Sequence, residues 1–202
     1  MRGENDTLAV KKSDVSGFER GFKTWCENIA ESTRERLDLR PYAPLSPREL
    51  AQNMGVTILD FSAVQGLDPA SAHYLTSQQG DEWSAVTVHA AGKQIIVVNP
   101  RHSEARQASN IMHELAHLIR GHKPSQVQRY QGYTLRDFKP LQENEANWLA
   151  GCLLLPRRTL LHIGYNGIEV ERAVELYGVS KSLYKYRVGV SGVSKQLRYV
   201  RP

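Results

Sequence analysis

His113-Glu114-Leu115-Ala116-His117 is the stretch of this sequence that carries the most chemical information. Residues four apart in an α-helix lie on nearly the same side of its axis, so the two histidines can hold one metal ion through their imidazole nitrogens. Glu114 lies beside them, where it can take a proton from a metal-activated water and later deliver it to a leaving amine. The pattern predicts a metallopeptidase site in which His113 and His117 bind the metal and Glu114 is catalytic.

The residues around this motif predict the helix that carries it. We expect that helix to run from about Ser103 to Arg120 and to end at Gly121, with Pro124 beyond it. The histidines lie opposite its apolar stripe, so the alternative interpretation is that they occupy a solvated face, since short motifs also occur by chance. The stripe consists of Ala108, Ile111, Leu115, Leu118 and Ile119.

A catalytic zinc site takes a third protein ligand and keeps one position open. A second helix, predicted from Leu141 to Leu155, offers Glu143 and Glu145, which project to nearly opposite sides, so only one of them can bind the ion. We prefer Glu143, because its side of the helix also carries small residues that allow close approach. Asn147, one turn further on, would then form a hydrogen bond with the ring nitrogen of a ligand histidine that does not face the metal. Glu145 is kept as the alternative ligand.

The remaining histidines are expected to play other parts. A longer metal-binding motif, with glycine at position 120 and histidine at position 123, is excluded by Arg120 and Lys123. We expect His122 to end the helix as a favourable C-terminal group. His102 and His89 are expected to be structural or exposed.

Composition and charge predict an ordinary globular protein. The 202 residues are 41% hydrophobic and 23% charged, which is enough apolar material for a core and argues against global disorder. A net charge of +5 permits an acidic partner or nucleic acid but requires neither. The two cysteines, Cys26 and Cys152, form no thiolate metal motif. The sequence begins without an apolar signal core and has no run of membrane-spanning length, so a cytoplasmic protein is expected.

The rest of the chain predicts further helices, a small sheet and one long loop. The run Ile95 to Val98 is apolar throughout, which indicates a strand buried on both faces. Residues 123–140 are polar and are expected to form a long loop, and residues 1–16 a flexible N-terminus. The other expected helices lie near residues 18–39, 48–53, 169–177 and 181–188, and the strands near 56–60, 83–89 and 94–99.

Four stretches of the chain together resemble the ImmA/IrrE metallopeptidases. They are Leu50–Val56, Ile95–Pro100, Ile111–Ile119 followed by Gly121-His122, and Glu143–Ala150 running into Leu154-Leu155-Pro156. The last two, in this order and spacing, are the specific part of the resemblance.

The resemblance implies an α+β, zincin-like fold with a small, mostly antiparallel sheet packed on helices, over residues 17–165. It implies one zinc ion per chain, although imidazole and carboxylate ligands also accept manganese or iron. By position, His113 and His117 match the ligand histidines, Glu114 the general base and Glu143 the downstream ligand. Asn147 departs from the family, where aspartate is common. The implied substrate is a protein partner, typically a helix-turn-helix repressor encoded nearby.

In zincins the substrate lies along an edge strand of the sheet as an added strand. We expect Trp83 to Val88 to be that strand, with backbone groups of Ser84 and Val86 orienting the substrate. This expectation rests on the resemblance alone.

The C-terminal segment, residues 166–202, predicts a helix-turn-helix arrangement that carries Lys181, Lys185 and Arg187. One interpretation is DNA contact. The preferred one is a helical pair that closes the peptidase domain and exposes a solvated basic face. The alternative function is therefore a non-catalytic regulator that binds DNA or a repressor, but the intact motif at 113–117 favours the enzyme.

Overall fold

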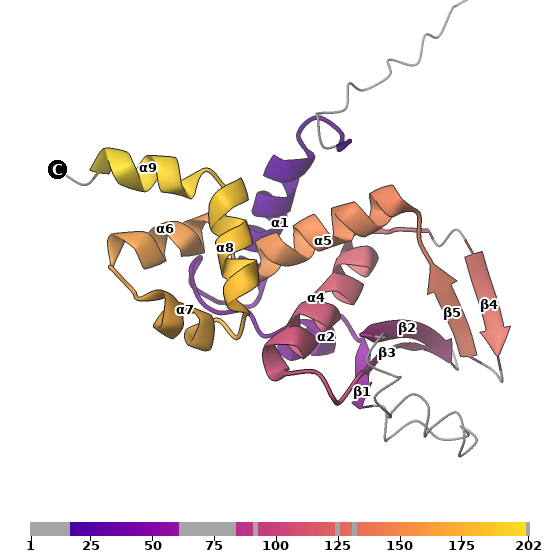
Figure 1. Ribbon diagram of the computed structural model, residues 1–202. Helices are drawn as coiled ribbons and strands as arrows, with labels where there is room; N and C mark the ends of the chain where they lie inside the picture. Colours follow the sequence, from indigo (N-terminus) through magenta and orange to yellow (C-terminus); the bar gives the residue numbers. More distant parts are fainter. Residues whose placement is uncertain (1–16, 61–83, 91–92, 124–125, 131–132, 201–202) are drawn as a thin grey trace, which may run out of the picture.

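The structure is a computed structural model that describes residues 17–60, 84–90, 93–123, 126–130 and 133–200. The expected flexible N-terminus, residues 1–16, lies outside the described residues. The elements in chain order are α1 (Phe22–Arg36), α2 (Pro47–Asn53), β1 (Thr57–Asp60), β2 (Ala85–Ala90), β3 (Lys93–Val98), α4 (Glu104–Arg120), β4 (Gln126–Tyr130), β5 (Tyr133–Asp137), α5 (Pro140–Leu154), α6 (Arg157–Tyr165), α7 (Val170–Leu176), α8 (Lys181–Val190) and α9 (Val193–Val200). Figure 1 shows the sheet at one end of the molecule and the C-terminal helices at the other, with α4 and α5 between them.

The sheet has the strand order β1-β3-β2-β5-β4. β1 runs parallel to β3, whereas the pairs β2–β3, β2–β5 and β4–β5 are antiparallel. Ile96, Val97 and Val98 are buried, as the apolar run predicts. The expected α+β class is confirmed, with helices predominating.

The helix signals in the sequence correspond to local capping. Ser46 accepts a hydrogen bond from the backbone N–H of Glu49 and starts α2, with Pro47 as its first residue. Ser103 starts α4 in the same way through Arg106. Gly121, with a φ of 71°, ends α4 in the left-handed conformation that favours glycine.

The prediction of a long loop over residues 123–140 was wrong. Strands β4 and β5 form an antiparallel pair there, from Gln126 opposite Asp137 to Tyr130 opposite Tyr133. In β5, Tyr133 and Leu135 alternate with Thr134 and Arg136, a short period-two signal that the high overall polarity of the segment obscured.

Two helices were also missed, α6 and α9. Pro156 follows the end of α5 and is also the N-cap of α6, since proline suits the start of a helix.

The helices share a core that reaches from α1 to α9. Ala173, Tyr177 and Val193 from the C-terminal segment belong to the same buried cluster as Leu115 of α4 and Leu149 of α5. The domain boundary near residue 165 stays a prediction. None of the helices in the described ranges is both long and apolar enough to span a lipid bilayer.

Candidate metal centre

α4 and α5 pack against each other and bring three predicted metal ligands together. The Nε2 atoms of His113 and His117 lie 3.1 Å apart. Glu143 places Oε2 3.2 Å from Nε2 of His113 and Oε1 3.4 Å from Nε2 of His117. Ligand atoms about 2.0–2.1 Å from a tetrahedral zinc ion would be roughly 3.3 Å apart. The nearly equal sides of this triangle therefore fit one small metal ion.

The triangle has one buried corner and two open ones. The side chain of His117 is only 2% exposed, whereas those of His113 and Glu143 are 21% and 42% exposed. Burial, with the neighbouring His113 and His122, lowers the pKa of His117 to about 3. His117 is therefore neutral near pH 7, with a nitrogen lone pair free for a metal, and it does not lie on a solvated face.

Asn147 contacts the other histidine of the triangle, His113, on the side away from Glu143 and His117. Its Oδ1 is 3.0 Å from Nδ1 of His113. Because an amide oxygen accepts, Nδ1 carries the proton, which leaves Nε2 of His113 unprotonated toward the triangle.

Glu114 reaches across to the sheet. Thr87 of β2 donates a hydrogen bond from Oγ1 to Oε2 of Glu114 at 2.5 Å. Burial raises the pKa of the Glu114 carboxyl, and the side-chain and backbone hydrogen bonds from Thr87 oppose that rise. The carboxylate is thus held beside the metal ligands with an increased affinity for protons.

Thr87 was not identified from the sequence. It is a buried polar residue inside the strand predicted over residues 83–89, between two valines. A polar side chain at an inward position of a strand was the available signal, because buried hydroxyls need a partner.

Phe138 was also missed. Its ring stacks on the His117 imidazole, with 3.9 Å between the ring centroids and 24° between the planes. It follows β5 directly, within the segment that the sequence predicted as a loop.

Glu145, the alternative ligand, lies away from the triangle. Its side chain is 8% exposed, and its Oε2 accepts from Nε of Arg120 at 3.1 Å and from Nε2 of His122 at 2.9 Å. The second nitrogen of His122, Nδ1, lies 3.0 Å from Nδ1 of His117. The prediction that His122 merely ends α4 was incomplete, because the turn at Gly121 directs its ring back onto a metal ligand.

His102 is not part of the triangle that the described residues form. His102 is buried, as the structural interpretation predicts, and its Nδ1 lies 3.2 Å from Nδ2 of Asn110. The side chain of His89 lies outside the described residues.

β2 lies between β3 and β5 in the strand order, so the expectation of an edge strand does not hold along its whole length; its pairing with β5 is at His89, beyond the expected range of residues 83–88. The carbonyl oxygen of Ser84 accepts from the backbone N–H of Asn99 beside β3 at 3.1 Å. Backbone groups alternate in an antiparallel pair, so those of Val86 also face β3, whereas those of Ala85 and Thr87 face away. The backbone of Ser84 and Val86 is thus already engaged within the sheet.

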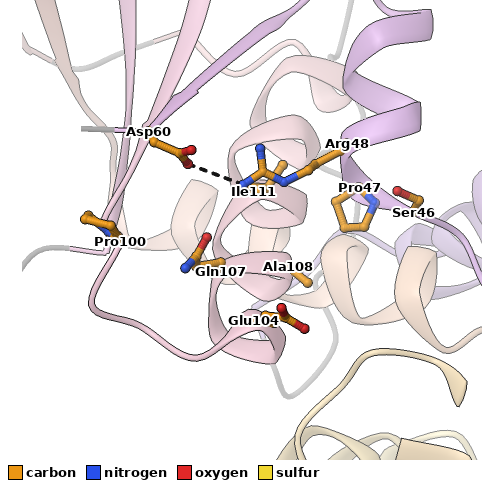
Figure 2. Close-up of a pocket in the computed structure, with 9 residues that line it drawn as sticks. All are labelled: Ser46, Pro47, Arg48, Asp60, Pro100, Glu104, Gln107, Ala108 and Ile111. Carbon is orange, nitrogen blue, oxygen red and sulfur yellow. Dashed lines mark hydrogen bonds and ion pairs between the residues drawn. The ribbon is translucent and has the colours of Figure 1, made fainter. Parts of the chain in front are cut away.

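A separate pocket of about 470 Å³ lies between α2, the end of β1 and the start of α4. Figure 2 shows Arg48 pairing with Asp60 across it, at 3.5 Å, with Glu104 and Gln107 on the α4 side. None of the residues that line it belongs to the metal triangle, so it is a different feature from the candidate metal centre.

Comparison with known proteins gives one match. No curated protein and no solved structure matches the chain. The family model of the peptidase family M78, described as the IrrE N-terminal-like domain, matches residues 51–188. This range includes His113, Glu114, His117 and Glu143, and it confirms the ImmA/IrrE resemblance. The chain therefore belongs to the IrrE N-terminal-like family of metallopeptidases.

Proposed function

We propose that this chain is a zinc-dependent endopeptidase that hydrolyses a peptide bond in a protein substrate. The observation that carries the proposal is the triangle of His113, His117 and Glu143 with Glu114 beside it. Two imidazoles and one carboxylate are a common ligand set of catalytic zinc, which keeps a further position open for water and substrate. The partial exposure of Glu143 agrees with such access.

The fold that we propose for this site is zincin-like. A zinc ion held by these three side chains would supply Lewis acidity, polarising the scissile carbonyl and activating water. Glu114 would act as the general base and then as the general acid toward the leaving amine, since its raised pKa suits both steps. Thr87 donates to Oε2 of Glu114 and so orients the carboxylate for the proton transfers.

An extended substrate would lie beside the first half of β2. Among the described residues, β2 pairs with β5 at His89, opposite Thr134, and this pairing does not extend to Ala85–Val88. The backbone of Ala85 faces away from β3, so we propose it, in place of Ser84 and Val86, as the group that aligns the substrate.

The substrate that we propose is a helix-turn-helix repressor encoded nearby, as the family resemblance implies. The alternative, a regulator that contacts DNA through α8, is less well supported. Arg187 is 1% exposed, and its Nη2 binds Oε1 of Glu27 at 2.7 Å, so this cation is not available to a phosphate backbone. Lys181 is paired with Glu171.

A cleavage assay tests the proposal. The purified chain would be incubated with the repressor encoded beside its gene, with and without a chelator and with added zinc, beside Glu114→Gln and Glu31→Gln. Glu31 pairs with Arg158 on the surface, so Glu31→Gln is a control that removes a carboxylate charge away from the metal triangle. We expect discrete fragments from wild type and Glu31→Gln, and none with chelator or Glu114→Gln. Fragments that persist in Glu114→Gln would refute the role of this base, and wild type that binds zinc without producing fragments would refute this substrate.

A further inference from the structure

A chain of polar contacts leads from the metal ligand His117 to the surface of α1. Nδ1 of His117 lies 3.0 Å from Nδ1 of His122, and Nε2 of His122 lies 2.9 Å from Oε2 of Glu145. The same oxygen of Glu145 accepts from Nε of Arg120 at 3.1 Å. His117, His122 and Glu145 have side chains that are 2%, 6% and 8% exposed, so the contacts are shielded from water.

With His122 neutral, only one arrangement of protons satisfies every contact in this chain. Glu145 accepts only, so Nε2 of His122 must carry the proton that points at it. A neutral His122 then presents a lone pair at Nδ1, which must accept from Nδ1–H of His117. His117 consequently has no proton on Nε2, the atom that lies 3.1 Å from Nε2 of His113. The opposite order would direct a lone pair of His122 at a carboxylate oxygen and a proton of His117 into the metal triangle.

The far end of the chain is held by α1. The guanidinium of Arg120 lies over the rings of Phe22 and Trp25, at 5.7 Å and 5.3 Å from their centroids. This contact fixes the cation that pairs with Glu145, through the attraction of a positive charge to an aromatic face. The Glu145 side chain is thereby held at a fixed position between α4 and α5 by Arg120 and His122.

We propose that Glu145, His122 and Arg120 are positioning residues that lock His117 in the tautomer and ring orientation required for metal binding. The inference rests on the proposed metal site but not on peptidase activity or on any substrate. Glu145, which the sequence offered as an alternative metal ligand, is here a positioning residue. Partners behind a metal-binding histidine typically change metal affinity about 10- to 100-fold.

Variants at position 122 separate positioning from packing. His122→Phe keeps a ring but removes both hydrogen bonds. His122→Gln offers an oxygen that can accept from His117 and an N–H that can donate to Glu145. Glu145→Gln keeps an acceptor but loses the charge that Arg120 balances. Glu31→Gln, which removes a carboxylate paired with Arg158 at the surface, is the matched control.

Two measurements decide the proposal. Zinc affinity, measured by competition with a chromogenic chelator, is expected to fall about 10- to 100-fold in His122→Phe, to recover in part in His122→Gln, and to stay unchanged in Glu31→Gln. Long-range ¹H–¹⁵N NMR of the metal-free wild type is expected to show His117 protonated at Nδ1 and His122 at Nε2. Unfolding midpoints of the metal-free variants would show whether any loss of affinity merely follows a loss of folding.

The possible outcomes are distinct. Wild-type zinc affinity in His122→Phe, or a metal-free His117 protonated at Nε2, would overturn the positioning role while leaving the metal site intact. Equal losses in His122→Phe and His122→Gln, in step with their unfolding midpoints, would also overturn it. A wild type that binds no zinc would instead refute the proposed function, and the NMR spectrum of the metal-free chain would still decide the tautomer of His117.

Discussion

Thr87 and Glu114 join the sheet to the candidate metal centre through a 2.5 Å hydrogen bond between Oγ1 and Oε2. The residues belong to β2 and α4, and no sequence motif connects them. The bond lowers the pKa of Glu114 against the raising effect of burial. Thr87 therefore adjusts the proton affinity of Glu114 as well as orienting its carboxylate.

Thr87→Val removes the hydroxyl and keeps the shape of the side chain. A hydrogen bond to a charged group is worth about 1.5–3 kcal/mol, so kcat/KM should fall about 10- to 100-fold. Removing a contact that lowers the pKa of Glu114 should move the acidic limb of the pH–activity profile to higher pH. Thr87→Ser should keep both the rate and the profile, and an unshifted limb in Thr87→Val would contradict the role given to the hydroxyl.

Metal-free protein should lose stability as the pH falls below 6.5. The pKa of His117 is about 3 in the fold against an ordinary 6.5, so the unfolded chain binds a proton between these values that the folded chain does not. Folding is therefore favoured at higher pH, with a slope approaching about 1.4 kcal/mol per pH unit. Urea unfolding with chelator at pH 5–6.5 measures this slope, which His117→Gln should reduce. Equal slopes in the two proteins would refute the assignment.

Zinc should raise the unfolding midpoint, and Glu143→Ala should abolish most of the increase. A ligand at 100 times its Kd stabilises the folded state by about 2.7 kcal/mol. Thermal scans with zinc and with chelator compare wild type, Glu143→Ala and Glu175→Ala. Glu175 forms an exposed pair with Arg172 and is the control. A full zinc response in Glu143→Ala would remove this residue from the metal site.

Arg187→Ala should destabilise the fold far more than Lys185→Ala on the same helix. Arg187 donates to Leu155 O at 3.1 Å and to Glu27 at 2.7 Å, and its side chain is 1% exposed. Removing one partner of a buried pair costs about 3–5 kcal/mol. Lys185 is exposed, and its loss should cost less than about 0.5 kcal/mol. Equal urea midpoints for the two variants would show that Arg187 does not help to fasten α8 to the core.

Gly164→Ala should weaken the contact between α6 and α9. An added Cβ would lie 2.3 Å from Cδ1 of Leu197, so overpacking of about 1–3 kcal/mol should exceed the gain in helix propensity. Gly189→Ala in α8 meets nothing within 4 Å and should stabilise by about 0.5–1 kcal/mol. Opposite shifts in the urea midpoint are expected, and a stabilised Gly164→Ala would contradict the tight contact.

The sequence predicted the parts of the site that depend on local spacing. A four-residue interval brings His113 and His117 to one side of α4, and a second interval does the same for Glu143 and Asn147 on α5. Thr87 and Phe138 could not be found in this way, because their roles depend on how the sheet packs against α4. Periodicity describes one element at a time and carries no information about such contacts.

His122 illustrates the same limit at a helix end. The sequence indicated that the helix stops near Gly121, but the direction of the chain after a left-handed residue decides which group the next side chain meets. The hairpin of β4 and β5 was missed for a different reason. Its residues are polar overall, and only β5 alternates apolar and polar residues, so the strand signal in this part of the sequence is weak.

The ligands of the proposed metal site lie on either side of the β4–β5 hairpin in sequence, with His117 before it and Glu143 after it. A bound ion would therefore act as a cross-link that closes a loop of chain containing the whole hairpin. An ion that binds only the folded chain stabilises the whole fold, so it would also stabilise strands that supply none of its ligands. Lengthening the chain between His117 and Glu143 would add only a small entropic cost, because the cost of closing a loop grows slowly with its length.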